Sequence, residues 1–241
     1  KEEIAKVSLA ASTLCANNSI SFILPILNHG TEAQKQKYLP LAAEGRLVSC
    51  IAITEPQTGS DVSSLRTRAV HDGNDWVING QKSWITWGAD AHYAMVFART
   101  SDEPGSKGIS AFIVDTKTPG FKVGRKEHKM GRHGSPSHEL LFENMRVPAD
   151  CLLGEEGMGF IACMKTLDLN RPTIAAGSLG LAQGALWVAM GDVWRIEGGV
   201  RGLIARDLDL VDLAVEADGT VSGTDGARVY RWTPSGAPLW Q

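Results

Sequence analysis

The sequence lacks the features that mark secreted, zinc-binding and membrane-spanning proteins. Its four cysteines are scattered without a Cys-x-x-Cys pair, and its six histidines lack ligand spacing, so we expect a reduced protein without structural zinc. The longest apolar run, residues 22–27, is broken by Pro25 and is far shorter than the ~20 residues of a membrane helix. No basic segment leads into an apolar stretch, so no signal peptide is expected.

Strong charge of either sign is also missing. The net charge is −3, and 43% of the 241 residues are hydrophobic while 21% are charged. This balance is typical of a globular chain and gives no reason to expect nucleic acid or an anionic membrane as partner. We expect a protein of the cytoplasm, or of the mitochondrial matrix in a eukaryote, and not a secreted one.

Residues 1–48 carry the spacing and end signals of helices. Gly30 interrupts the pattern, and the side chains of Thr31 and Gln34 have the spacing of a capping box. Apolar residues recur at helical spacing before that break; they are Ile4, Val7, Ala11 and Leu14. We expect a truncated N-terminal helical domain over these residues.

The pattern changes to short strands from residue 49 to 156, which predicts an antiparallel β domain. Residues 76–78 and 81–86 flank Asn79 and Gly80, a dipeptide that favours a type I′ hairpin turn. Three more strands are expected at residues 93–98, 109–114 and 139–142.

Helical spacing returns in residues 157–190, which we expect to begin a C-terminal helical domain. Pro172 should kink this helix. Glycines at 177, 180 and 184 line a narrow face that lets another backbone approach. With the β domain before it, this segment completes an α+β fold.

The tail, residues 191–241, differs in composition and has no lysine. Residues 213–215, 220–221 and 229–232 favour strands, and 217–219 and 224–226 favour turns. We expect a small β unit here that is unrelated to the preceding domain.

Three groups of residues could carry chemistry. Residues 51–61 run from an apolar strand into a turn with hydroxyls and a glycine, which suits a pyrophosphate but also describes an ordinary turn. Trp84 and Thr86 share one side of a strand, where a tryptophan is more often core. Asp168 and Arg171 share a helix face, either as a surface ion pair or with Arg171 directed toward something buried.

Together these segments resemble the acyl-CoA dehydrogenase family. The matching segments occur in family order and at family-like spacing, over about residues 1–190. They are residues 52–61, 78–86, 131–135, 142–148 and 167–171.

The resemblance implies a flavoprotein that binds FAD and dehydrogenates an acyl-CoA thioester, and it implies homotetramers and an electron-transfer flavoprotein as the electron acceptor. It places Thr54 at the flavin ring edge, Thr86 near flavin N5 and Trp84 against the ring. Substrate contacts would come from Ser60, Asp168 and Arg171. The full set implied to line FAD is Ile51, Ile53, Thr54, Gly59, Ser60, Trp84, Ile85 and Thr86.

The chain departs from the family at the catalytic base. The usual glutamate belongs to a later segment than those matched here, and the alternative position holds Asn170, which cannot accept the proton. We therefore assign no catalytic residue and expect these 241 residues alone to lack dehydrogenase turnover. An inactive FAD-binding remnant or scaffold with a C-terminal interaction module stays open, as does an acyl-CoA oxidase or flavin monooxygenase.

The tail resembles one blade of a tectonin-like β-propeller through residues 212–221 and 229–232. One blade cannot close a propeller. A fusion, a frameshifted end and a misassembled reading frame all remain open for it.

Overall fold

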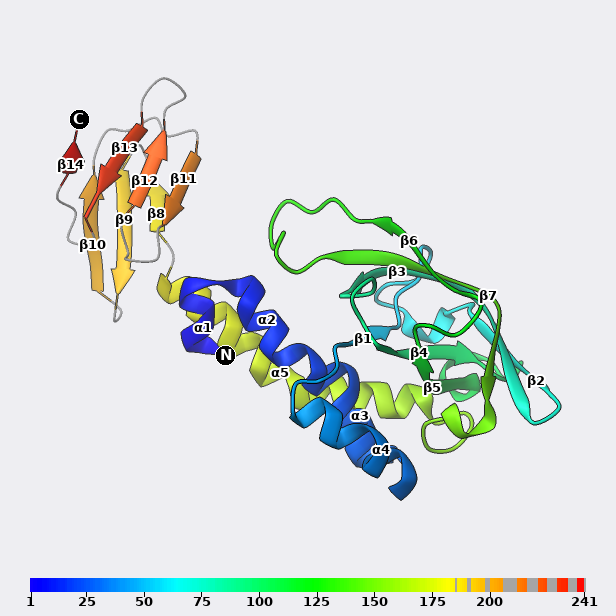
Figure 1. The fold of residues 1–241 in the computed structure, drawn as a ribbon. Helices are drawn as coiled ribbons and strands as arrows, with labels where there is room; N and C mark the ends of the chain where they lie inside the picture. Colours follow the sequence, from blue (N-terminus) through cyan, green and yellow to red (C-terminus); the bar gives the residue numbers. More distant parts are fainter. Residues whose placement is uncertain are drawn as a thin grey trace. The chain divides into compact units, whose positions relative to one another are not determined.

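The computed structural model describes residues 1–184, 186–189, 192–197, 200–205, 212–215, 221–224, 229–233 and 238–240. The chain divides into two compact units, which are described separately (Figure 1). One unit is residues 13–173, and the other combines residues 1–12 with residues 174–241.

The N-terminal segment is helical, as its pattern predicts. The capping box is confirmed: the Thr31 hydroxyl accepts from the Gln34 amide at 3.2 Å, and the Gln34 side chain accepts from the Thr31 amide at 3.1 Å. The last helix runs through Pro40, and the chain then turns at Gly45, whose φ is 69°. The elements are α1 (Glu2–Val7), α2 (Leu9–Asn18), the π-helical turn η1 (Ser19–Ile23), α3 (Leu24–His29) and α4 (Glu32–Ala43).

Residues 9–29 form one helical stretch that is long and apolar enough to cross a membrane by length and composition alone. The sequence expectation counted only uninterrupted apolar runs and missed it. Phe22 and Ile26 of this stretch are fully buried in a core cluster with Tyr38 and Phe97. A core helix passes the same test of composition, so the stretch is weak evidence for a membrane span.

A curled, mixed seven-stranded sheet forms the centre of residues 13–173. Six strands run in the order β1-β4-β2-β3-β7-β6, and β5 pairs with β4. The strands are β1 (Ser49–Ala52), β2 (Arg68–Asp72), β3 (Asp75–Thr86), β4 (Tyr93–Arg99), β5 (Ile109–Asp115), β6 (Phe121–Lys126) and β7 (Ser137–Pro148).

The sheet is not purely antiparallel as predicted. β1 pairs with β4 in parallel, with Ser49 opposite Tyr93, and β2 meets β4 in parallel at Arg68 and Arg99. Two parallel neighbouring strands need a long connection between them. Here the connection from β1 to β4 contains β2, β3 and their loops. Alternating side chains do not encode strand direction, so the sequence pattern could not reveal this pairing.

The predicted hairpin at Asn79 and Gly80 is wrong. Both residues lie inside the single strand β3, where the register with β7 shifts between Ile78 and Gly80. The hairpin turn lies earlier, at Gly73, which has a φ of 65° and joins β2 to β3. Gly80 is needed for space, because a Cβ there would lie 2.5 Å from the Thr67 hydroxyl oxygen.

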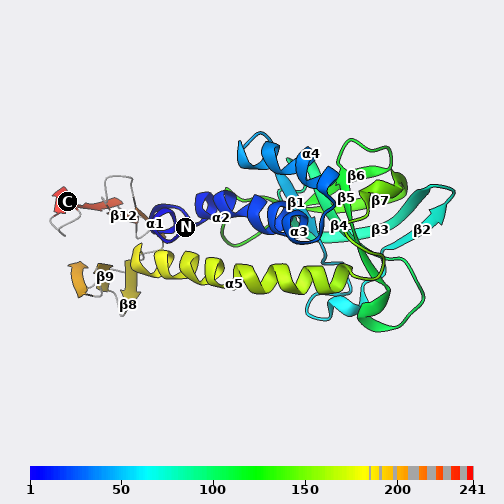
Figure 2. The same cartoon turned by 90° about the horizontal axis from the view of Figure 1, so that it is seen from below.

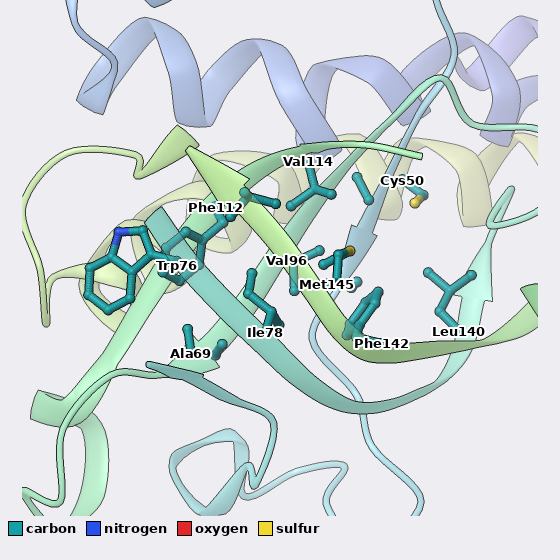
Figure 3. Close-up of a cluster of buried hydrophobic side chains, with 14 of the residues drawn as sticks. Cys50, Ala69, Trp76, Ile78, Val96, Phe112, Val114, Leu140, Phe142 and Met145 are labelled. Carbon is teal, nitrogen blue, oxygen red and sulfur yellow. The ribbon is translucent and has the colours of Figure 1, made fainter. Parts of the chain in front are cut away.

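Buried side chains of the sheet form the main core (Figure 3). Trp76 lies edge-on to Phe112 with the ring centroids 5.3 Å apart. Ile78, Val96 and Met145 are fully buried in the same cluster. Burying such side chains contributes about 1.5–3 kcal/mol each, which makes the sheet a rigid support for the residues at its surface.

Side-chain amides of α2 attach the helices to the edge strand β1. Asn18 Oδ1 accepts from the Ser49 amide at 3.0 Å, and Asn18 Nδ2 donates to the Leu47 carbonyl at 2.7 Å. Asn17 Nδ2 donates to the Ser49 carbonyl. These bonds satisfy backbone groups that an exposed edge would leave unpaired.

The long helix α5 (Gly159–Gly184) is continuous through Pro172 (Figure 2). It ends before the predicted residue 190, because strand β8 begins at Leu186. The expected narrow face is confirmed at Gly180, where a Cβ would lie 2.1 Å from the Glu2 carbonyl oxygen of α1.

Strands make up nearly all of the described residues of the tail, as predicted, and strand β8 lies before it, in the segment expected to be helical. One antiparallel sheet has the order β10-β9-β8 and another has the order β11-β12-β13-β14. Four strands are the number in a propeller blade, and the blade resemblance stays a prediction. The predicted turns at 217–219 and 225–226 lie outside the described residues. The strands are β8 (Leu186–Ala189), β9 (Asp192–Glu197), β10 (Val200–Ala205), β11 (Asp212–Val215), β12 (Val221–Thr224), β13 (Val229–Trp232) and β14 (Pro238–Trp240).

Candidate functional site

The turn of residues 53–60, which follows β1, is hydrogen-bonded to strand β3. The Ser83 amide donates to the Thr54 carbonyl at 2.9 Å. Glu55 and Thr58 close the turn with two mutual backbone bonds of 3.0 and 3.1 Å. These contacts bring the Thr54 backbone next to Ser83, the residue that precedes Trp84.

Trp84 and Thr86 lie on the side of β3 opposite to Ile85. A register shift between Lys82 and Ile85 and a φ of 63° at Trp84 re-aim the strand there. The Trp84 side chain is 53% exposed, whereas Ile85 is buried in the sheet core. Trp84 is therefore not a core tryptophan, and Ile85 can meet a ligand only through its backbone.

The end of the turn offers free polar groups. Gly59 and Ser60 are exposed, and their backbone amides make no hydrogen bond within the part of the chain that the structure describes. A Cβ at Gly59 would meet no atom within 4 Å. Adjacent free amides and a hydroxyl beside open space can receive an anionic group.

A buried ion pair between Lys82 and Glu55 lies under this turn. The Lys82 ammonium donates to Glu55 Oε1 at 2.9 Å and to the Ile53 carbonyl at 3.0 Å. The Glu55 carboxylate also accepts from the Thr67 amide at 2.9 Å and from the Arg66 amide at 2.6 Å. Both side chains are almost completely buried, so Glu55 holds the turn in place and cannot reach a substrate.

Burial and the mutual attraction of the two charges together set the pKa values of this pair. It lowers the pKa of Lys82 to about 8, although the charge of Glu55 acts in the opposite direction. Burial also acts to raise the pKa of Glu55, but the Lys82 charge and the hydrogen bonds to the carboxylate outweigh it, so that pKa lies below its ordinary value. Both groups are charged at pH 7.

Sequence reasoning missed Lys82, which is buried beside the candidate site. A lysine in an alternating strand is normally exposed, and the alternation in β3 shifts at its bulges. The available signal was the lone lysine among the apolar and aromatic residues of 76–86, together with a glutamate in the facing turn.

The helix residues Asp168 and Arg171 form a surface ion pair. Arg171 Nε donates to Asp168 Oδ1 at 2.8 Å, and the Arg171 side chain is 75% exposed. The expectation that Arg171 points toward something buried is wrong in this structure. Helical spacing placed it beside apolar Leu167 and Ile174, but Ile174 is itself exposed. The neighbouring Asn170 is the buried member of this segment.

No group of three or more histidine, cysteine, aspartate or glutamate side chains could hold a metal ion among the residues that the structure describes. All four cysteines are free.

Known proteins match the same part of the chain. Residues 1–46 match the acyl-CoA dehydrogenase N-terminal domain, and residues 50–145 match the middle domain. A probable acyl-CoA dehydrogenase, FadE25 of Mycobacterium tuberculosis, is 47% identical over 76% of this chain and 46% of its own.

Two solved structures are similar in fold and sequence. Butyryl-CoA dehydrogenase of Megasphaera elsdenii has a TM-score of 0.74 and 41% identity, over 76% of this chain and 48% of that one. A chain from a structure of the electron transferring flavoprotein of Acidaminococcus fermentans has a TM-score of 0.74, 45% identity and the same coverage. The present chain thus spans about half the length of these relatives. Through its N-terminal and middle domains, the chain belongs to the acyl-CoA dehydrogenase family.

Proposed function

We propose that this protein binds FAD on the surface formed by the turn of residues 53–60 and strand β3, and that it acts in flavin-dependent dehydrogenation of an acyl-CoA thioester. The observation that carries the proposal is the exposed Trp84 indole beside the Thr54 turn. A large exposed aromatic ring next to free backbone amides fits a ligand with a flat ring system and a pyrophosphate.

Each residue has a role in this proposal. Trp84 packs against the flavin ring, and Thr54 and Thr86 bond to its edge. Gly59 and Ser60 receive the pyrophosphate through their amides, and Ser60 also contacts substrate. Ile51 and Ile53 back the turn, and Ile85 contributes its backbone. Asp168 and Arg171 are hydrophilic contacts for the CoA moiety.

The bound flavin supplies a hydride acceptor, while the protein must supply a base for the α-proton of the thioester. By the family resemblance, Asn170 stands at the alternative position for that base, and its side chain is neutral and buried. This observation favours, as a second candidate, an FAD-binding chain that does not turn over acyl-CoA. An oxidase or monooxygenase stays an alternative without an observation of its own.

The proposal includes the partners that the family resemblance implies. An acyl-CoA is the substrate, and an electron-transfer flavoprotein accepts the electrons. Similarity to a chain from the Acidaminococcus fermentans structure supports the second partner. Assembly into tetramers belongs to the same proposal.

Titration of the purified chain with FAD, followed by visible absorption, tests cofactor binding. We expect a shifted flavin spectrum, and binding at least about tenfold weaker in Trp84→Ala, because a buried aromatic contact contributes on the order of 1.4 kcal/mol or more. Val70→Ala removes a similarly exposed apolar side chain from β2 and is the matched control. Equal binding by Trp84→Ala would contradict the assigned surface.

Anaerobic mixing of the FAD-loaded chain with acyl-CoA separates the two candidates. If Asn170 leaves the chain without a base, acyl-CoA perturbs the flavin spectrum but does not bleach it. Rapid bleaching that a single Glu→Gln change abolishes would identify a base elsewhere and reject the inactive candidate.

A further inference from the structure

The buried pair of Lys82 and Glu55 joins the two halves of the candidate flavin surface. The turn that carries Thr54 comes from the end of β1, and Trp84 comes from β3. Between them, side-chain bonds run from Lys82 to the Ile53 carbonyl at 3.0 Å and to the Glu55 carboxylate at 2.9 Å. A backbone bond from the Ser83 amide to the Thr54 carbonyl, at 2.9 Å, also connects the two segments.

Glu55 extends this connection to a third segment. Its carboxylate accepts from the Arg66 amide, the Thr67 amide and the Thr67 hydroxyl, at 2.6, 2.9 and 2.6 Å. Gln57 donates to it from within the turn at 2.7 Å. All of its acceptor positions are therefore engaged in holding the turn and the approach to β2 against β3.

A buried ion pair adds little net stability between two segments. Desolvating both charges costs about as much as their attraction returns, and apolar residues of similar volume often stabilise a fold equally well. A buried pair beside a proposed binding surface is therefore better explained by the geometry that it fixes than by stability alone.

We propose that Lys82 and Glu55 are positioning residues, which set the spacing between the Thr54 turn and Trp84 and so preorganise the surface for the flavin. This inference rests on the proposed function. Neither side chain touches the cofactor, since both are buried beneath the turn.

The decisive comparison uses Lys82→Met, Glu55→Gln and the variant with both changes. Each single change leaves the partner's buried charge without its counter-charge and destabilises the fold. The double change removes both charges, so we expect it to recover much of the stability measured by urea unfolding. Flavin affinity should stay reduced in all three variants, by on the order of tenfold to a hundredfold, because the turn is no longer fixed.

Amide hydrogen exchange gives a readout that does not need the cofactor. Without FAD, the double variant should exchange faster than the parent protein at Glu55, Thr58 and Ser83, whose amides close the turn and bind it to β3. Lys122→Met with Glu143→Gln removes an exposed lysine–glutamate pair between β6 and β7, and it should change neither exchange at these amides nor flavin affinity.

The outcomes separate this inference from the function on which it rests. If the parent chain binds no FAD, the proposed function fails and the positioning role falls with it. If the parent binds FAD and the stable double variant binds it equally well, only the positioning role is overturned. The positioning role is also overturned if flavin affinity falls in parallel with stability in the single variants and recovers fully in the double variant.

Discussion

Trp87, just after β3, holds a backbone conformation that is costly for a large side chain. Its φ is 62°, and its amide donates to the Pro136 carbonyl at 2.9 Å. The indole Nε1 is buried without a hydrogen-bond partner among the described residues. A left-handed conformation costs a non-glycine residue roughly 1–2 kcal/mol, so the fold tolerates strain at this position.

We expect the free energy of unfolding, measured with urea, to be about 1 kcal/mol higher for Trp87→Gly than for Trp87→Ala. Both changes remove the ring, but only glycine adopts this φ without steric cost. At Val70, an exposed position in β2, the order should reverse, because glycine is the weaker strand residue. Equal stability of the two Trp87 variants would show that the surrounding structure relaxes the strain.

Glu55 should make the fold sensitive to acid. Its folded pKa lies below the ordinary value of 4.5, so the unfolded chain takes up the proton first. The contribution to stability is therefore present above about pH 4.5 and is lost as the pH falls through the lower folded pKa.

Urea unfolding between pH 3 and pH 7 should show a shallower loss of stability in Glu55→Gln than in the parent chain. Glu143→Gln removes an exposed carboxylate and should keep the parent slope. An unchanged slope in Glu55→Gln would mean that other carboxylates dominate the acid response.

At the scale of single residues, the sequence indicated which segments form the candidate site better than it indicated which side chains are buried. The Thr54 carbonyl accepts from the amide of Ser83, the residue before Trp84, and the shared site of Thr54 and Trp84 stays a prediction. Lys82 is buried and Arg171 is exposed, and both depend on which side of an element other segments cover. Only the assembled fold determines that.

Strand β3 carries two register shifts, and each of them affects a residue at or near the proposed flavin surface. The shift near Gly80 lets Thr67 approach, and Thr67 then donates to Glu55. The shift between Lys82 and Ile85 sends Lys82 inward and Trp84 outward. Bulges next to binding sites commonly re-aim side chains in this way.

Gly80→Ala should destabilise the protein by about 1–3 kcal/mol, because the added methyl group would overlap the Thr67 backbone as well as its side chain. Gly73→Ala is the matched control: its φ is also positive, but nothing lies within 4 Å of the added Cβ. It should cost only about 1 kcal/mol. Equal losses in thermal unfolding would show that the strand moves aside at Gly80.

Local sequence patterns predicted helices and strands well, but they failed where one pattern is compatible with two different structures. The capping box at Thr31 and the strand at 109–114 are specified by neighbouring residues alone. An Asn-Gly pair occurs in hairpin turns and in irregular strands. Here β3 pairs with β7 on both sides of Asn79 and Gly80, so the strand continues through them. The parallel neighbours β1 and β4 depend on a contact between distant segments, which a local pattern does not contain.

At the scale of the whole molecule, helix α5 presents large apolar side chains to solvent. Ile161 is 43% exposed and Leu169 is 58% exposed. Exposed apolar surface of this kind promotes association or dye binding.

We expect the chain to bind a hydrophobic dye and to show concentration-dependent light scattering, and Ile161→Gln with Leu169→Gln to reduce both. Val70→Thr changes a similarly exposed side chain on β2 and should leave both signals unchanged. Dye binding that is equal in all three proteins would place the exposed apolar surface elsewhere.

The parallel pairing of β1 with β4 also sets an order of events during synthesis. Ser49 meets Tyr93 across the sheet, and the Phe22 ring of the preceding helices packs against that same tyrosine at 5.7 Å. While the ribosome still holds residues 93–99, the helices have no sheet to pack on and β1 has no neighbour. Residues 1–52 of the nascent chain must therefore stay soluble until β4 emerges, when these helices, β1 and β4 can fold together.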